Sequence, residues 1–124
     1  MYNYYRLHTK KVKIMYKKTL LIDLDGVLNT YVGGYQADFI PPIRQGAKEF
    51  LIALEPNFEL KLFTTRPAEL AQKWLDDNEI SHLFTEVTNI KKPAWLLIDD
   101  RCLTFNGDYD DLTTKIINFA PWYK

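Results

Sequence analysis

The stretch Thr19-Leu20-Leu21-Ile22-Asp23-Leu24-Asp25-Gly26 decides the fold of this chain. Residues 19–24 form a short, almost wholly apolar run, which is the pattern of a strand buried on both faces of a parallel sheet. Asp25-Gly26 then breaks the run. The sequence therefore predicts a buried parallel strand that ends in two carboxylates.

Strand and helix patterns alternate along the rest of the chain. Strands are predicted at 59–63 and 94–98, with a weaker one at 83–87. Apolar residues at helical spacing predict helices over 44–54, from Pro67 to about residue 78, and over 112–119, with Trp122 as an anchor. This alternation favours one α/β domain over residues 19–124, Rossmann-like, with a parallel sheet flanked by helices.

Composition excludes several classes of protein. With 47% hydrophobic and 26% charged residues, the 124-residue chain is neither disordered nor collagen-like. Its longest apolar runs, 50–54 and 94–98, are far short of the roughly 20 residues that cross a bilayer, so no membrane partner is expected. The lone Cys102 cannot form an internal disulfide, which suggests a reducing, cytoplasmic location, and we expect it in the core.

Charge is unevenly distributed along the chain. Six of the 16 Lys and Arg residues lie in residues 1–18, which hold no Asp or Glu. We expect this basic leader to be a solvated tail, with binding of nucleic acid or an anionic surface as the alternative. It is no secretory signal, because no apolar stretch of about 7–15 residues follows the charges. Met15 is an alternative natural start.

Each of the three strong strands ends in a polar cluster. The clusters are Asp23-x-Asp25-Gly26, Thr64-Thr65-Arg66 and Asp99-Asp100-Arg101. In an open parallel sheet, ligands bind beyond the carboxyl ends of the strands, so the clusters should converge on one rim. Four carboxylates would repel one another without a cation, and hard oxygen ligands favour Mg²⁺ over zinc. A metal and basic side chains at such a rim suit a phosphate ester attacked by a carboxylate.

These clusters resemble motifs of the haloacid dehalogenase (HAD) superfamily of phosphatases. Asp23-Leu24-Asp25-Gly26-Val27-Leu28-Asn29 is similar to its first motif, Leu62-Phe63-Thr64-Thr65-Arg66-Pro67 to its second, and Leu97-Ile98-Asp99-Asp100-Arg101 to its acidic fourth. The likeness spans residues 19–106 and is greatest to small bacterial and phage members without an elaborate cap.

The resemblance implies a role for each matching residue. Asp23 would be the nucleophile that forms an aspartyl-phosphate, and Asp25 would protonate the leaving group and later deprotonate water. Mg²⁺ would be held by Asp23, the backbone carbonyl of Asp25, and Asp100 with Asp99 in support. Thr64 would bind a phosphoryl oxygen, and Gly26 would let the backbone approach the phosphate. The remaining candidate phosphate contacts are Thr65, Arg66 and Arg101, the two arginines having surface or ion-pair roles as alternatives.

The third motif is where this sequence departs from the family, which places a lysine well ahead of the acidic strand. Here Lys91 and Lys92 stand only seven or eight residues before Asp99. A helical crossover needs about ten residues or more, so the chain should return in an almost fully extended form. We expect Lys92 to fill the catalytic lysine role, with Lys91 close to the substrate.

Residues 26–63 leave no room for a separate cap domain between the first two motifs. An open site suggests a bulky phosphorylated substrate, loose specificity, or a cap supplied by a partner subunit in a homo-oligomer, and residues 31–42 are the candidate flap. The expected function is Mg²⁺-dependent hydrolysis of a phosphomonoester. The alternatives are a nucleic-acid end phosphatase, resembling the phosphatase half of polynucleotide kinases, and a catalytically idle HAD-like binding domain.

Overall fold

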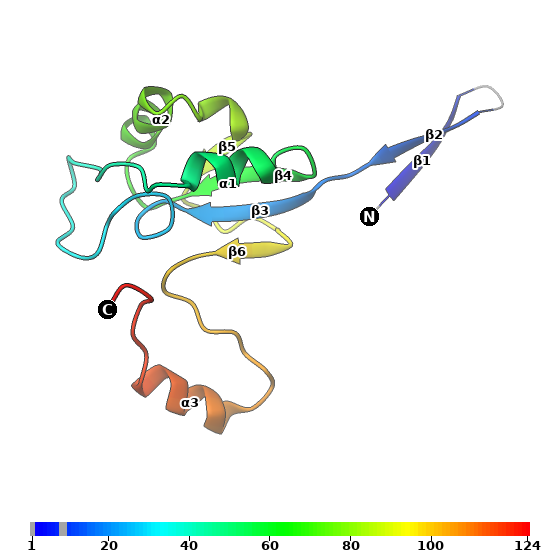
Figure 1. The fold of residues 1–124 in the computed structure, drawn as a ribbon. Coiled ribbons are helices and arrows are strands. Elements are labelled where there is room, and N and C mark those ends of the chain that lie inside the picture. The colour runs from blue at the N-terminus through cyan, green and yellow to red at the C-terminus, as the bar shows by residue number, and fades with distance from the viewer. Residues whose placement is uncertain (1, 8–9) are drawn as a thin grey trace.

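Four parallel strands form the central sheet of the protein. The computed structural model describes residues 2–7 and 10–124, with side chains from Tyr16 onward. The strand order is β5-β4-β3-β6, and every neighbouring pair is parallel (Figure 1). The strands span Lys18–Asp23 (β3), Phe58–Phe63 (β4), Glu86–Thr88 (β5) and Leu96–Ile98 (β6). The predicted Rossmann-like α/β fold is confirmed.

Two helices cover one face of this sheet and bury the core. They are α1, Ala47–Leu54, and α2, Ala68–Asp77. Alternate residues of a strand point to the same face. On the face of β3 and β4 that meets the helices, every buried residue is leucine or isoleucine. The core contains Leu20, Ile22, Leu60 and Leu62 from the strands and Ala47, Leu51, Ala71, Trp74 and Leu75 from the helices. Between Asp25 and Thr64 the chain holds a loop, α1 and β4, so no cap domain is inserted there.

Local chemistry sets where the helices begin. Gly46 has a φ of 90°, a left-handed conformation that an α-helix does not contain, so α1 begins at Ala47 and not at the predicted residue 44. Asp108 caps α3 (Tyr109–Ile117) by accepting hydrogen bonds from two backbone N–H groups of its first turn. This cap starts α3 three residues ahead of the predicted position. No helix in the described part of the chain is long and apolar enough to cross a membrane.

The opposite face of the sheet carries the buried Leu21 together with polar side chains. Thr19 Oγ1 donates to Glu59 Oε1 at 2.9 Å, joining β3 to β4. Lys61 and Lys92 both pair with Glu86, which lies opposite Lys61 on β5. Residues 89–95 connect β5 to β6 without a helix, as the short spacing predicts. The weaker strand predicted at 83–87 is the three-residue β5, because Ser81–Leu83 form a 3-10 helix, η1.

Residues expected to be a solvated tail instead contain two paired strands. β1 (Tyr2–Leu7) pairs antiparallel with β2 (Lys10–Met15), and this hairpin extends away from the central sheet (Figure 1). The domain itself begins with β3 at Lys18, one residue before the predicted boundary. The cluster of basic residues in this segment carries no signal for a hairpin.

Candidate active site

The carboxyl ends of β3, β4 and β6 meet at one hollow of about 270 Å³. The parallel register places Ile22 beside Ile98, so the residues that follow them, Asp23 and Asp99, leave the sheet side by side. Most of the predicted site residues line this hollow, together with three aromatic side chains that the sequence analysis did not assign. The lining consists of Asp23, Asp25, Tyr31, Tyr35, Phe63, Thr64, Thr65, Asp99, Asp100 and Arg101.

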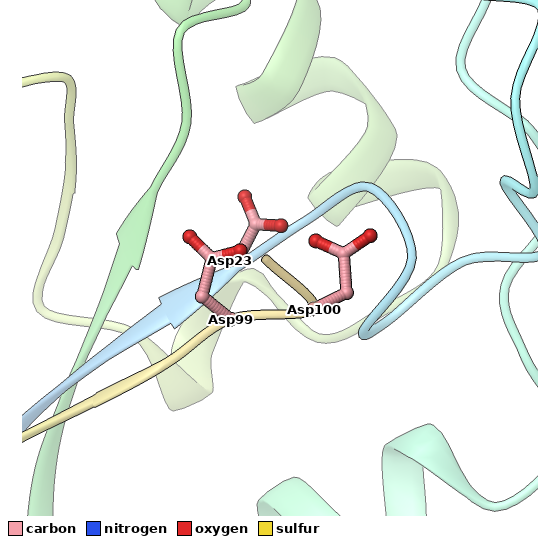
Figure 2. Close-up of side chains that lie close together, drawn as sticks. All are labelled: Asp23, Asp99 and Asp100. Carbon is pink, nitrogen blue, oxygen red and sulfur yellow. The ribbon is translucent and has the colours of Figure 1, made fainter. Parts of the chain in front are cut away.

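Three carboxylates form a cluster in the hollow. Asp23, Asp99 and Asp100 each offer an oxygen atom, and these atoms all lie within 4.8 Å of one another (Figure 2). Burial, then the charges of Asp99 and Asp100, raises the pKa of Asp23 to about 8. Burial likewise raises the pKa of Asp99, with Asp100 adding to the effect.

A hard divalent cation fits this donor set. Crowded carboxylates favour the protonated form of Asp23, and a cation bound between them would reverse that preference by removing the repulsion. All three donors are oxygen atoms, which Mg²⁺ prefers.

Asp25 is held by two neighbours. The Arg66 guanidinium donates from Nε to Asp25 Oδ2 at 2.8 Å and from Nη2 to Oδ1 at 3.1 Å. Asn29 Nδ2 donates to the same Oδ1 at 3.0 Å. The Arg66 side chain is only 1% exposed and does not line the hollow. Of the two roles considered for Arg66, the structure shows the ion pair.

Arg66 also contacts the candidate flap, residues 31–42. Its Nη1 donates to the carbonyl oxygen of Gln36 at 2.9 Å, and its guanidinium carbon lies 4.6 Å from the centre of the Tyr35 ring. The fully buried Asn29 accepts hydrogen bonds from the backbone N–H groups of Gly26 and Tyr31. Asn29 belongs to the first motif, but the sequence analysis gave it no role.

The structure shows a second reason for glycine at position 26, besides the predicted approach of the backbone to the phosphate. Its φ is 83°, and a Cβ atom at this position would collide with the carboxylate of Asp100. The absence of a side chain therefore makes room for Asp100.

Thr64 is buried at the end of β4 and lines the hollow. Its backbone N–H donates to the Thr88 carbonyl at 2.9 Å, and its Oγ1 accepts from the Arg66 N–H at 3.2 Å. Thr64 does not cap α2, since Pro67 occupies the N-cap position. The neighbouring Thr65 is exposed to the hollow.

The basic side chains are distributed differently from the prediction. Lys92 is paired with Glu86, and neither Lys92 nor Lys91 lines the hollow. Arg101 does line it, and its backbone N–H donates to Asp99 Oδ1 at 2.9 Å. Spacing alone cannot reveal the Lys92 pair, because Glu86 becomes its neighbour only when β5 joins the sheet.

Three further observations concern residues near the acidic cluster. Cys102 is exposed and is not part of the core. Partial desolvation of its thiol, followed by the charge of Asp99, raises the pKa of Cys102. Trp122, predicted as an anchor, is 62% exposed, and its Nε1 donates to the Gly26 carbonyl at 3.0 Å. The Tyr123 hydroxyl donates to Asp100 Oδ2 at 2.9 Å, a contact that no sequence pattern signalled.

No family model matches the sequence, and no curated protein matches it. Among solved structures, the chain is similar to a conserved protein from Bacteroides thetaiotaomicron, with a TM-score of 0.56 and 22% sequence identity. The likeness covers 82% of this chain and 91% of that chain. At this level of identity, what the two proteins share is the fold, and the chain is a small α/β protein built on a parallel sheet.

Proposed function

We propose that this protein is a Mg²⁺-dependent phosphomonoesterase that works through an aspartyl-phosphate on Asp23. The observation that carries the proposal is the convergence of Asp23, Asp25, Thr64, Asp99 and Asp100 on one hollow. These are the residues that match the HAD motifs, and they come from three separate strand ends. Bound Mg²⁺ would neutralise the carboxylate cluster, so that Asp23 is ionised at neutral pH and a phosphate can approach.

The reaction takes two displacements at phosphorus. In the first, an Asp23 oxygen forms a bond to phosphorus while the bond to the leaving oxygen breaks, and Asp25 gives that oxygen a proton. In the second, water attacks phosphorus and gives its proton to Asp25, and the bond between Asp23 and phosphorus breaks. Inorganic phosphate and an alcohol leave, and both carboxyl groups return to their starting states.

The other lining residues offer contacts to the phosphoryl oxygens and to the remainder of the substrate. Thr64, Thr65 and Arg101 offer hydroxyl, backbone and guanidinium donors to the phosphoryl oxygens. Tyr31 and Tyr35 form an aromatic rim on the candidate flap. Because no cap domain covers the hollow, we expect activity on several phosphomonoesters, including large ones.

A nucleic-acid end phosphatase is the second candidate. Arg6 lies in β1, and Lys10, Lys11 and Lys13 lie in β2. The hairpin therefore places four basic residues on an arm that would attract a nucleic-acid backbone, whereas the acidic domain would repel it.

Hydrolysis of p-nitrophenyl phosphate with and without Mg²⁺ tests the main proposal. Asp23→Asn should lower kcat at least about 10³-fold, because it removes the anionic nucleophile. Asp77→Asn is the matched control, since Asp77 pairs with Lys73 on the exposed side of α2. Borohydride should reduce the acyl phosphate and leave a homoserine at position 23 that mass spectrometry detects.

Three results would contradict the proposal: full activity in excess EDTA, an active Asp23→Asn variant, or trapping at another residue. A protein that binds Mg²⁺ but hydrolyses no phosphate ester in a panel of metabolites and oligonucleotides would instead be the idle binding domain.

A further inference from the structure

Residues 121–124, here called the strap, cross the loop that follows Asp23. Trp122 of the strap donates to the Gly26 carbonyl in this loop, and Tyr123 donates to the carboxylate of Asp100, which follows β6. Pro121, at the start of the strap, is buried. The strap is therefore attached to both segments that build the acidic cluster, the one that follows β3 and the one that follows β6.

The Asp100 carboxylate is enclosed between Gly26 and Tyr123. On one side, Gly26 comes so close that even a methyl group would collide with Asp100 Oδ2. On the other side, the Tyr123 hydroxyl donates to the same oxygen at 2.9 Å. Backbone packing and a directional hydrogen bond thus restrict one carboxylate oxygen, and with it the rotation of the whole group.

Trp122 holds Tyr123 in place. The two rings meet edge to face, with their centres 5.5 Å apart and their planes at 89°. The Arg44 guanidinium carbon lies 4.6 Å from the centre of the Trp122 ring, and the backbone N–H of Arg44 donates to the Leu28 carbonyl at 2.8 Å. The Tyr123 ring is therefore fixed through Trp122 to the loop that carries the first motif.

We propose that Tyr123 is a positioning residue for the metal site, orienting Asp100 toward the cation that it would share with Asp23 and Asp99. This inference rests on the proposed function. A tyrosine suits the task because its hydroxyl is uncharged and donates one hydrogen bond, so Asp100 keeps its negative charge and a second oxygen for the cation. Hydrogen-bond partners of ligating carboxylates typically contribute 10- to 100-fold to metal affinity.

Tyr123→Phe tests this inference, because it removes the hydroxyl and keeps the ring that packs on Trp122. Mg²⁺ binding is measured by isothermal titration calorimetry, and thermal unfolding is followed in EDTA and in saturating Mg²⁺. We expect Mg²⁺ to bind about 10-fold or more weakly, while Tm in EDTA stays close to wild type. The Mg²⁺ concentration for half-maximal hydrolysis should rise by the same factor, and kcat at saturation should largely recover.

Tyr109→Phe is the control, since Tyr109 is 74% exposed on α3. Trp122→Phe is a second variant that retains a ring but loses the donor to Gly26, and it should also weaken Mg²⁺ binding.

An unchanged Mg²⁺ affinity in Tyr123→Phe overturns the inference. An equal loss of Tm with and without Mg²⁺ also overturns it, because that result indicates a purely structural contact. If the wild-type protein binds no Mg²⁺, the proposed function fails together with the inference. If wild type binds Mg²⁺ and hydrolyses phosphate esters while Tyr123→Phe is unaltered, only the inference fails.

Discussion

Both oxygens of Asp25 already accept hydrogen bonds, from Arg66 and Asn29. A general base can work in this arrangement, because it needs only a free lone pair. A general acid must carry a proton on one oxygen, and in this arrangement that proton would point at an N–H donor. In the proposed reaction, Asp25 therefore has to exchange one of these contacts before it protonates the leaving group. Arg66 is placed to control that exchange, since it also contacts Gln36 and Tyr35 of the candidate flap.

The loss of kcat/KM in Arg66→Lys should depend on the leaving group of the substrate. Lysine keeps the charge but cannot reproduce the two-point contact, so Asp25 should lose its orientation. General acid catalysis contributes about 10²–10⁴-fold where a leaving group needs a proton. We expect a loss on that scale for alkyl phosphates and a much smaller one for p-nitrophenyl phosphate, measured as kcat/KM. Asp25→Asn should show the same split, whereas equal losses on both substrates would give Arg66 a structural role only.

The raised pKa of Asp23 makes the stability of the metal-free protein depend on pH. The pKa moves from an ordinary value of 3.8 to about 8 in the folded protein. Between these values the folded protein binds a proton more tightly than the unfolded chain, so the free energy of unfolding falls as pH rises. In EDTA, Tm should fall from pH 4 to pH 8, and Asp23→Asn should flatten this slope. Mg²⁺ should raise Tm more at pH 8 than at pH 5, and a Tm that rises with pH would contradict the raised pKa.

The β1–β2 hairpin extends away from the central sheet and from the proposed catalytic residues. A protein that starts at Met15 lacks β1 and nearly all of β2, together with Arg6, Lys10, Lys11 and Lys13. We expect it to fold and to hydrolyse p-nitrophenyl phosphate at a near wild-type rate.

Oligonucleotide substrates decide what the hairpin does. If it binds nucleic acid, the truncated protein should lose activity on 3′- or 5′-phosphorylated oligonucleotides selectively. The affinity of the full-length protein for them should also fall steeply with salt, because phosphate contacts release counterions. Equal activity of both proteins on every substrate would remove the second candidate function. A truncated protein that fails to fold would show that the hairpin supports the domain.

The sequence predicts those elements whose signal is local. Burial on both faces makes residues 19–24 and 59–63 apolar runs, and the order of strands and helices follows from such runs. The carboxylates at the strand ends are predictable for the same reason, since parallel strands bring them to one edge. Side-chain contacts that no local pattern signals are not predictable in this way. The pairing of Lys92 with Glu86 and of Tyr123 with Asp100 depends on the completed sheet and on the path of the strap.

The molecule as a whole has a sheet with two unlike faces. One face is closed by α1 and α2 over a leucine-rich core, and the other carries the pairs of Glu86 with Lys61 and Lys92. A parallel sheet usually has helices on both faces, and here the short link of residues 89–95 provides none for the second face. Most of the stabilisation by burial should therefore come from one side.

Two substitutions in β4 compare the two faces. Leu62→Ala should cost about 2–5 kcal/mol in the free energy of unfolding, because Leu62 is fully buried in the core. Lys61→Ala, its neighbour on the other face, should cost about 1 kcal/mol or less, since Glu86 keeps its second partner, Lys92. Urea denaturation in excess Mg²⁺ measures both values. Similar losses for the two variants would mean that the polar face is as important for stability as the core.

The contact between Gly26 and Trp122 joins residues 96 positions apart, which sets the order in which a newly synthesised chain assembles. The last fully packed core residue, Leu83, leaves the ribosome well before Trp122. A nascent chain can therefore bury its core while Gly26 and Asp100 still lack their partners from the strap. Contacts of this sequence separation form late in folding, because they close a long loop. The acidic cluster, the proposed metal site, is thus the part of the protein that we expect to mature last.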